Sequence, residues 1–126
     1  VDQRISLPTF EHLGLCGDLL HDGGKKAAFW IDDQVDELTL NHINISCCRY
    51  GIYSDNFSDS LRVRGLHMAA VDFPIWFDVT STNCYNSFTD CIWADGDGPC
   101  VVHSAANDSV PFNFNNVHIV RQGRVK

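Results

Sequence analysis

Three aspartates close three similar short segments of the chain and could together bind or hydrolyse a sugar. The segments are residues 28–32, 51–55 and 74–78, and each carries an aromatic residue two positions before its aspartate. Ionised carboxylates accept hydrogen bonds from hydroxyl groups, and a pair of carboxyl groups can catalyse the hydrolysis of a glycosidic bond. The candidate catalytic residues are therefore Asp32, Asp55 and Asp78.

The aromatic residues of the same segments supply a surface for sugar rings. The candidate substrate-binding residues are Trp30, Tyr53 and Trp76. Their faces can stack on the apolar C–H surface of a sugar. Side chains alternate between the two faces of a strand, so inward-facing Ile52 and Ile75 imply that the aromatic and acidic side chains face outward. Two alternatives stay open: the aspartates only form turns at strand ends, and the aromatic stripe contacts a neighbouring subunit.

The composition favours strands and turns over helices. Among 126 residues there are 14 Asp, 9 Asn and 9 Gly, whereas Glu, Lys, Gln and Met together number nine. The first group favours turns and the second favours helices. The length suits one domain, and the hydrophobic share of 44% is enough for a packed core. The sequence predicts an all-β fold that forms one domain over residues 1–126, with a loop insertion at residues 18–26.

A repeat runs through the chain, with copies 30, 23, 25 and 26 residues apart. Five segments share one pattern: an apolar residue, two mostly polar residues, an apolar residue, any residue, and another apolar residue. They are residues 10–15, 40–45, 63–68, 88–93 and 114–119. Their third position holds residue types that tolerate a left-handed backbone conformation: His12, His42, Gly65, Asp90 and Asn116. Each segment is predicted to be two short strands joined by a sharp bend.

Stacked copies of such a repeat form a parallel β-helix, in which each strand pairs with its equivalent one rung away, about 4.8 Å distant. Each rung is predicted to have about three short strands, and the five segments predict about five rungs. Adjacent rungs would set the aspartates about 5 Å apart and alternate rungs about 10 Å apart, near the separations of retaining and inverting glycosidases. The competing fold is an antiparallel β-sandwich, for which the Asp-Gly pairs at residues 22–23, 95–96 and 97–98 supply hairpin signals.

The repeats at residues 38–45, 61–68 and 112–119, with residues 50–55 between two of them, carry a resemblance to a known family. Together they resemble the right-handed parallel β-helix of pectate-lyase-like proteins. More narrowly, they look like a segment of a bacteriophage tailspike or tail-fibre depolymerase. The resemblance covers residues 35–120 and implies a homotrimer, a place in the virion and a bacterial surface polysaccharide as the substrate.

The expected function is therefore that of a virion receptor-binding tailspike module, which binds a host cell-surface polysaccharide and, as a depolymerase, hydrolyses it. The alternative is a non-catalytic structural virion protein, such as a trimeric β-helix decoration or a fibre segment. A polysaccharide lyase is disfavoured, because no basic cluster with flanking carboxylates is evident. The expected partners are the host polysaccharide, identical subunits and other virion proteins.

Nucleic acids, membranes, cofactors and metals are not expected from the sequence. The net charge of −7 disfavours a nucleic-acid partner, and no apolar run is long enough for a membrane span. No cofactor motif or metal-ligand spacing is evident. The six cysteines include the adjacent pair Cys47 and Cys48 and are interpreted as mostly reduced thiols. Reduced thiols favour assembly in a reducing host cytoplasm, with the virion then acting outside the cell.

Overall fold

The structure, a computed structural model, describes residues 5–6, 8–17, 27–31, 35–54, 60–78, 85–103 and 112–120. Within these ranges all regular elements are β-strands. The part of the chain described holds no helix long and apolar enough to cross a membrane. The predicted loop insertion at residues 18–26 lies outside the described residues, and so do two of the candidate catalytic residues, Asp32 and Asp55.

Most of the strands belong to two sheets. The larger sheet has the order β12 (Phe112–Val120), β10 (Tyr85–Ala94), β8 (Ser60–Ala69), β6 (Leu38–Ser46) and β2 (Thr9–Glu11), and β3 (Gly14–Cys16) also pairs with β6. The smaller sheet has the order β11 (Val101–His103), β9 (Phe73–Phe77), β7 (Tyr50–Ser54) and β4 (Ala27–Ile31). Separately, β1 (Ile5–Ser6) pairs with β5 (Val35–Asp36).

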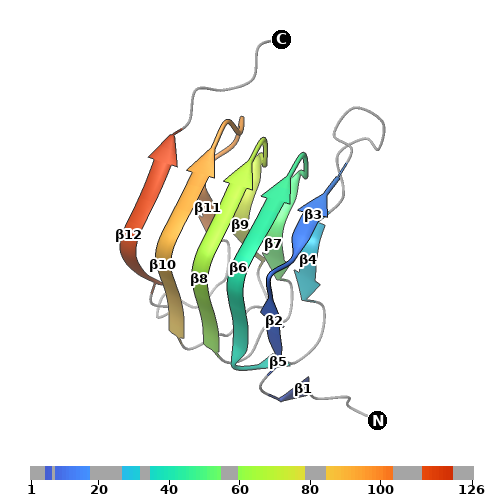
Figure 1. Ribbon diagram of the computed structural model, residues 1–126, viewed down its shortest axis with the longest axis vertical. Coiled ribbons are helices and arrows are strands. Elements are labelled where there is room, and N and C mark those ends of the chain that lie inside the picture. The colour runs from blue at the N-terminus through green and yellow to red at the C-terminus, as the bar shows by residue number, and fades with distance from the viewer. Residues whose placement is uncertain are drawn as a thin grey trace.

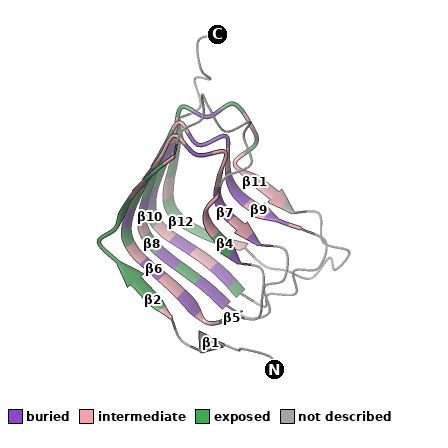
Figure 2. Ribbon diagram, turned by 90° about the vertical axis from the view of Figure 1, so that its right-hand side faces the viewer, coloured by how far each residue is buried: buried purple, intermediate pink, exposed green. Residues whose placement is uncertain are grey.

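Every strand pairing among the described residues is parallel. From β6 to β12 the chain alternates between the two sheets, so each strand pairs with strands one repeat away and not with its neighbour in sequence (Figure 1). Figure 2 shows the two sheets converging toward one end of the molecule. This arrangement is consistent with a parallel β-helix and excludes an antiparallel β-sandwich.

Equivalent positions of the sequence repeat lie side by side in the larger sheet. Phe10 pairs with Leu40, and Leu40 pairs with Val63. Val63 in turn pairs with Phe88, and Phe88 pairs with Phe114. The register predicted from the repeat is therefore confirmed across the whole sheet.

The bend predicted at the third repeat position is present in every copy. The backbone φ angle is positive there, between 53° and 68°, at His12, His42, Gly65, Asp90 and Asn116. Pairing between β6 and β8 omits His42 and Gly65 and resumes at Ile43 and Leu66. From β6 onward each repeat has one long bent strand in this sheet where two short strands were predicted. The strand continues because its neighbours bend at the same position, so the hydrogen-bond ladder is restored beyond the bend.

A second column of left-handed residues ends the long strands. Cys47, Ala70 and Asp95 have φ angles of 55°, 55° and 57°. The backbone N–H of each donates to the carbonyl oxygen of the last strand residue in the next repeat, over 2.9 to 3.1 Å. This turn leads the chain into the smaller sheet. The sequence did not predict it, because Cys and Ala are not types that favour a left-handed conformation.

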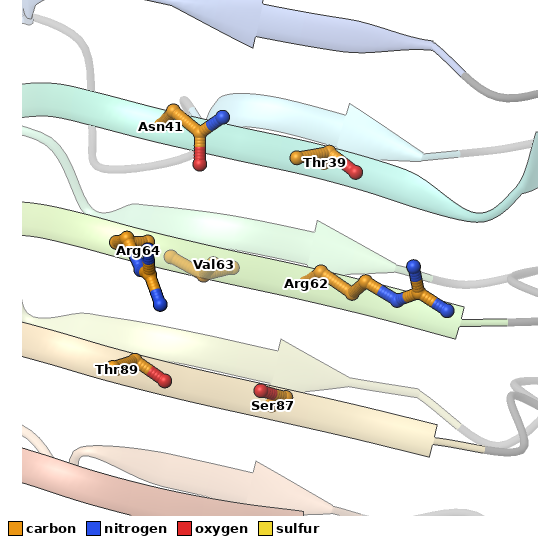
Figure 3. A pocket seen from close by; sticks show the side chains of 7 residues that line it. All are labelled: Thr39, Asn41, Arg62, Val63, Arg64, Ser87 and Thr89. Carbon is orange, nitrogen blue, oxygen red and sulfur yellow. The ribbon is translucent and has the colours of Figure 1, made fainter.

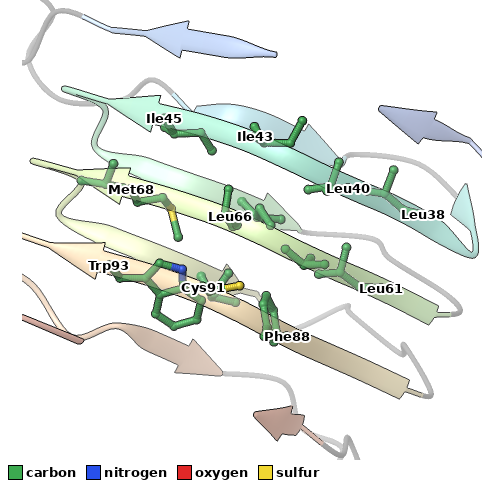
Figure 4. Packing of buried hydrophobic residues seen from close by; sticks show 14 of the residues in the cluster. Leu38, Leu40, Ile43, Ile45, Leu61, Leu66, Met68, Phe88, Cys91 and Trp93 are labelled. Atoms are coloured by element: carbon green, nitrogen blue, oxygen red, sulfur yellow. The ribbon is translucent and has the colours of Figure 1, made fainter. Parts of the chain in front are cut away.

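Alternate residues of the long strands point between the two sheets and form the core (Figure 4). In the central repeats Ile43, Leu66 and Cys91 are fully buried. In the first repeat the equivalent residue, Leu13, is 38% exposed, and in the last repeat the equivalent residue, Val117, is half-buried. A repeat therefore buries its apolar residues only when another repeat covers each side of it.

Leu66→Ala is expected to lower the free energy of unfolding by about 2–5 kcal/mol, because it leaves a cavity in the middle of the core. Leu13→Ala removes the same atoms from the equivalent, half-exposed position and is expected to cost about 1 kcal/mol or less. Urea denaturation followed by circular dichroism measures both. Equal losses for the two variants would contradict a core that is closed by stacking of the repeats.

Gly65→Ala is expected to lower the free energy of unfolding by about 1–2 kcal/mol, because an L-residue is strained at positive φ. The φ angle is 68°, and an added Cβ would lie 2.9 Å from Nδ1 of His42. Gly14→Ala is the matched control, since an added Cβ there meets no heavy atom within 4 Å. The control is expected to change stability by no more than about 0.5 kcal/mol in the same denaturation experiment. A Gly65→Ala variant as stable as this control would refute the requirement for glycine in this copy of the bend.

Candidate functional site

The three candidate aromatic residues form one column across the smaller sheet. Trp30 pairs with Tyr53, and Tyr53 pairs with Trp76. The ring centroids are 5.0 Å apart in the first pair and 6.4 Å apart in the second. Ile52 and Ile75 are fully buried, so the alternation of side chains along β7 and β9 places the aromatic column on the outer face.

Exposure differs along this column. Trp30 is 56% exposed, whereas Tyr53 and Trp76 are half-buried. The Nε1 atom of Trp76 is buried and has no hydrogen-bond partner among the described residues. Trp30 is therefore the residue of the column whose ring a ligand can reach most readily, and the other two rings support it.

Three further residues, which the sequence did not predict as part of the site, complete an aromatic cluster around the column. Tyr50 and Phe73 pair on β7 and β9, and their rings stack with centroids 5.5 Å apart. Both rings contact Trp76 edge-on, at 5.5 Å and 5.0 Å. The Arg49 guanidinium carbon lies 5.7 Å and 5.4 Å from the two ring centroids. The sequence did contain a signal for Tyr50 and Phe73, because each is an aromatic residue three positions before a member of the column.

Asp78 is the candidate acid that the structure describes. It directly follows β9, and its backbone N–H donates to the Ser54 carbonyl oxygen over 2.7 Å. The Tyr53 hydroxyl donates to Oδ2 of Asp78 over 2.9 Å. The carboxylate is thus held against the aromatic column, and a carboxylate is a group that accepts hydrogen bonds from hydroxyl groups. The spacing of the three aspartates stays a prediction, because Asp32 and Asp55 lie outside the described residues.

The histidines do not gather at one place in the described part of the chain. His12 and His42 stack at the bend with ring centroids 5.3 Å apart. His67 on β8 and His118 on β12 are separated by Ile92 on β10. Among the described residues no group of three or more His, Cys, Asp or Glu side chains is placed to hold a metal ion.

Cys91 is buried in the core and is poorly suited to nucleophilic chemistry. Its thiol donates to the Thr89 carbonyl oxygen over 3.4 Å. Burial, with a smaller contribution from the charge of Asp90, raises the pKa of the Cys91 thiol above its ordinary value of 9.0. The thiol is therefore protonated at neutral pH, and the thiolate that nucleophilic attack requires is not formed.

Comparison of the chain with known protein families, curated proteins and solved structures found no match. No family can therefore be assigned to the chain. The roles of its residues have to be inferred from the geometry of its own side chains.

Cys91 is expected to resist alkylation in the folded protein while the exposed Cys16 reacts. The rates should differ by about a hundredfold or more, because reaction at Cys91 requires the core to open. Iodoacetamide labelling followed by peptide mass spectrometry measures both rates. Above pH 9.0 the unfolded thiol ionises while the folded one stays protonated, so stability should fall as pH rises. Cys91→Ala should weaken this pH dependence, and equal labelling of the two cysteines would contradict the burial of Cys91.

Proposed function

We propose that the chain is a β-helix module that binds a polysaccharide along the outer face of β4, β7 and β9. The observation that carries the proposal is the exposed ring of Trp30 at the end of an in-register aromatic column. An exposed indole face stacks on the apolar side of a sugar ring, which makes it a suitable anchor for a carbohydrate. The column runs across three strands, so the surface is elongated and suits a polymer better than a single sugar.

Polar groups beside the rings suit sugar hydroxyls. The Tyr53 hydroxyl donates its proton to the Asp78 carboxylate over 2.9 Å, and the oxygen atoms of both groups are acceptors of the kind that sugar hydroxyls bind. Arg49 adds a cationic donor beside Tyr50 and Phe73. Apolar walls with a few placed polar groups are the usual composition of a ligand site.

Binding is the activity proposed for this surface, and hydrolysis stays a prediction from the sequence. Hydrolysis needs a second carboxyl group about 5–10 Å from the first. The two other candidate acids, Asp32 and Asp55, lie outside the described residues. Asp78 is therefore assigned here the role of a hydrogen-bond acceptor for sugar hydroxyls.

The resemblance to tailspikes supports a more specific assignment. We infer that the polysaccharide is a bacterial cell-surface glycan, and that the chain is a right-handed β-helix of about five rungs in a homotrimeric virion protein. The repeat and the parallel sheets support the β-helix, whereas the trimer, the virion and the host glycan are supported by the resemblance alone. The alternative is a structural fibre or decoration protein, in which a neighbouring subunit would cover the aromatic cluster.

Trp30→Ala is expected to weaken binding to a bacterial surface polysaccharide about tenfold, because the stacking of one sugar ring is lost. Tyr85→Ala is the matched control, since it removes a 69% exposed aromatic side chain from β10 in the other sheet. An array of purified bacterial capsular and O-antigen polysaccharides identifies the ligand, and biolayer interferometry then measures the affinity of each variant.

Two results would contradict the proposed function. The first is a folded wild-type protein that binds no polysaccharide on the array. The second is an equal loss of affinity in Trp30→Ala and Tyr85→Ala. Loss of a trimer in Trp30→Ala, measured by analytical ultracentrifugation, would instead assign the aromatic cluster to a subunit contact.

A further inference from the structure

A second surface, on the outer face of the larger sheet, carries two arginines that the aromatic cluster does not use. Arg62 and Arg64 stand two positions apart on β8, and both are exposed. They line a shallow groove of about 260 Å³ that crosses β6, β8 and β10 (Figure 3). We propose that this groove binds the acidic groups, carboxylate or sulfate, of an anionic polysaccharide.

Neutral polar side chains flank each arginine in the ladder. Two come from β6 and two from β10: Thr39, Asn41, Ser87 and Thr89. The hydroxyls of Thr39 and Ser87 lie on either side of Arg62, because both residues pair with it. An amide and a hydroxyl flank Arg64 in the same way. Hydroxyl and amide groups both donate and accept hydrogen bonds, as sugar hydroxyls do, so the groove can bind the uncharged part of a glycan as well.

The side chains in line with the two arginines do not neutralise the positive charge of the groove. Each arginine belongs to a row of residues that pair with one another across the larger sheet. Among the described residues of these rows the single acid is Glu11 on β2, which lies two strands from Arg64. Two strand spacings, about 9.6 Å, separate the backbones of Glu11 and Arg64. The Glu11 carboxylate instead accepts a hydrogen bond from the Asn41 amide over 3.3 Å.

The spacing of the two arginines suits a polymer with repeated charges. Residues two apart on a strand are about 6.6 Å apart and project from the same face. Each guanidinium has five N–H donors in a planar fork and can bind an oxyanion through two parallel hydrogen bonds. The pair can therefore bind two acidic groups along one chain.

Other anionic polymers fit this groove less well. Its lining contains no aromatic ring on which a nucleic-acid base could stack. A protein partner would need an apolar centre to its interface, whereas the outward side chains here are polar. An acidic polysaccharide needs only paired charges and hydrogen bonds.

The test uses three forms of one polymer: dextran, carboxymethyl-dextran and dextran sulfate. In isothermal titration calorimetry the wild-type protein should bind at least one charged form about tenfold or more tightly than dextran. Which charged form is preferred distinguishes carboxylate from sulfate recognition. Arg62→Gln/Arg64→Gln should abolish the preference, and added salt should weaken it in the wild type. Lys25→Gln/Lys26→Gln, which removes the same number of positive charges at another place in the sequence, should retain it.

Equal affinity of the wild type for all three polymers would overturn the proposal. An equal loss in Lys25→Gln/Lys26→Gln would also overturn it, because any two positive charges would then serve. Urea denaturation checks that the double variant is folded. If the double variant is unfolded, the single variants Arg62→Gln and Arg64→Gln are tested in its place. Trp30→Ala should keep the preference for charged dextran, so the outcome here is separable from that of the polysaccharide site on the smaller sheet.

Discussion

Backbone hydrogen bonds between equivalent residues of parallel strands hold the rest of the structure in place. A parallel ladder has no tight hairpin to fix its register, so the register depends on features that recur in every repeat. Two such features coincide here, the inward apolar residues of the long strands and the two columns of left-handed residues. A shift of one residue would turn the inward side chains outward and would misplace both bends. The two features therefore specify the same pairing.

The larger part of this ladder could be predicted from the sequence, because its signals lie within each repeat. His42, Gly65 and Asp90 mark the first bend by residue type alone. The second bend could not be predicted, since Cys47 and Ala70 adopt a conformation that the surrounding ladder imposes on them. In the candidate site the register of Trp30 and Trp76 was predictable. Their different exposure was not, because it depends on how neighbouring rings pack against one of them and not the other.

Stacking of the repeats places residues that hold the same position in each repeat side by side. Columns of similar side chains therefore form on the outer face of each sheet. The smaller sheet presents aromatic rings with a carboxylate beside them, and the larger sheet presents hydroxyls, amides and two guanidinium groups. The chain is acidic overall, with a net charge of −7. Salt screens charges beyond about 8–10 Å under physiological conditions. The attraction of an oxyanion to Arg62 and Arg64 is therefore local, and the overall charge opposes it mainly at low ionic strength.

The turns between the two sheets differ in length without disturbing the pairing on either side. Residues 47–49 link β6 to β7 and residues 70–72 link β8 to β9, whereas residues 95–100 link β10 to β11. Strands on both sides of the longer connection keep their register. Lengthening a loop costs little, about 0.6 kcal/mol for each doubling. Residues can thus be inserted into these turns, by evolution or by engineering, without a change in the pairing of the strands. The circumference of the molecule would grow there while its stacked core stays the same.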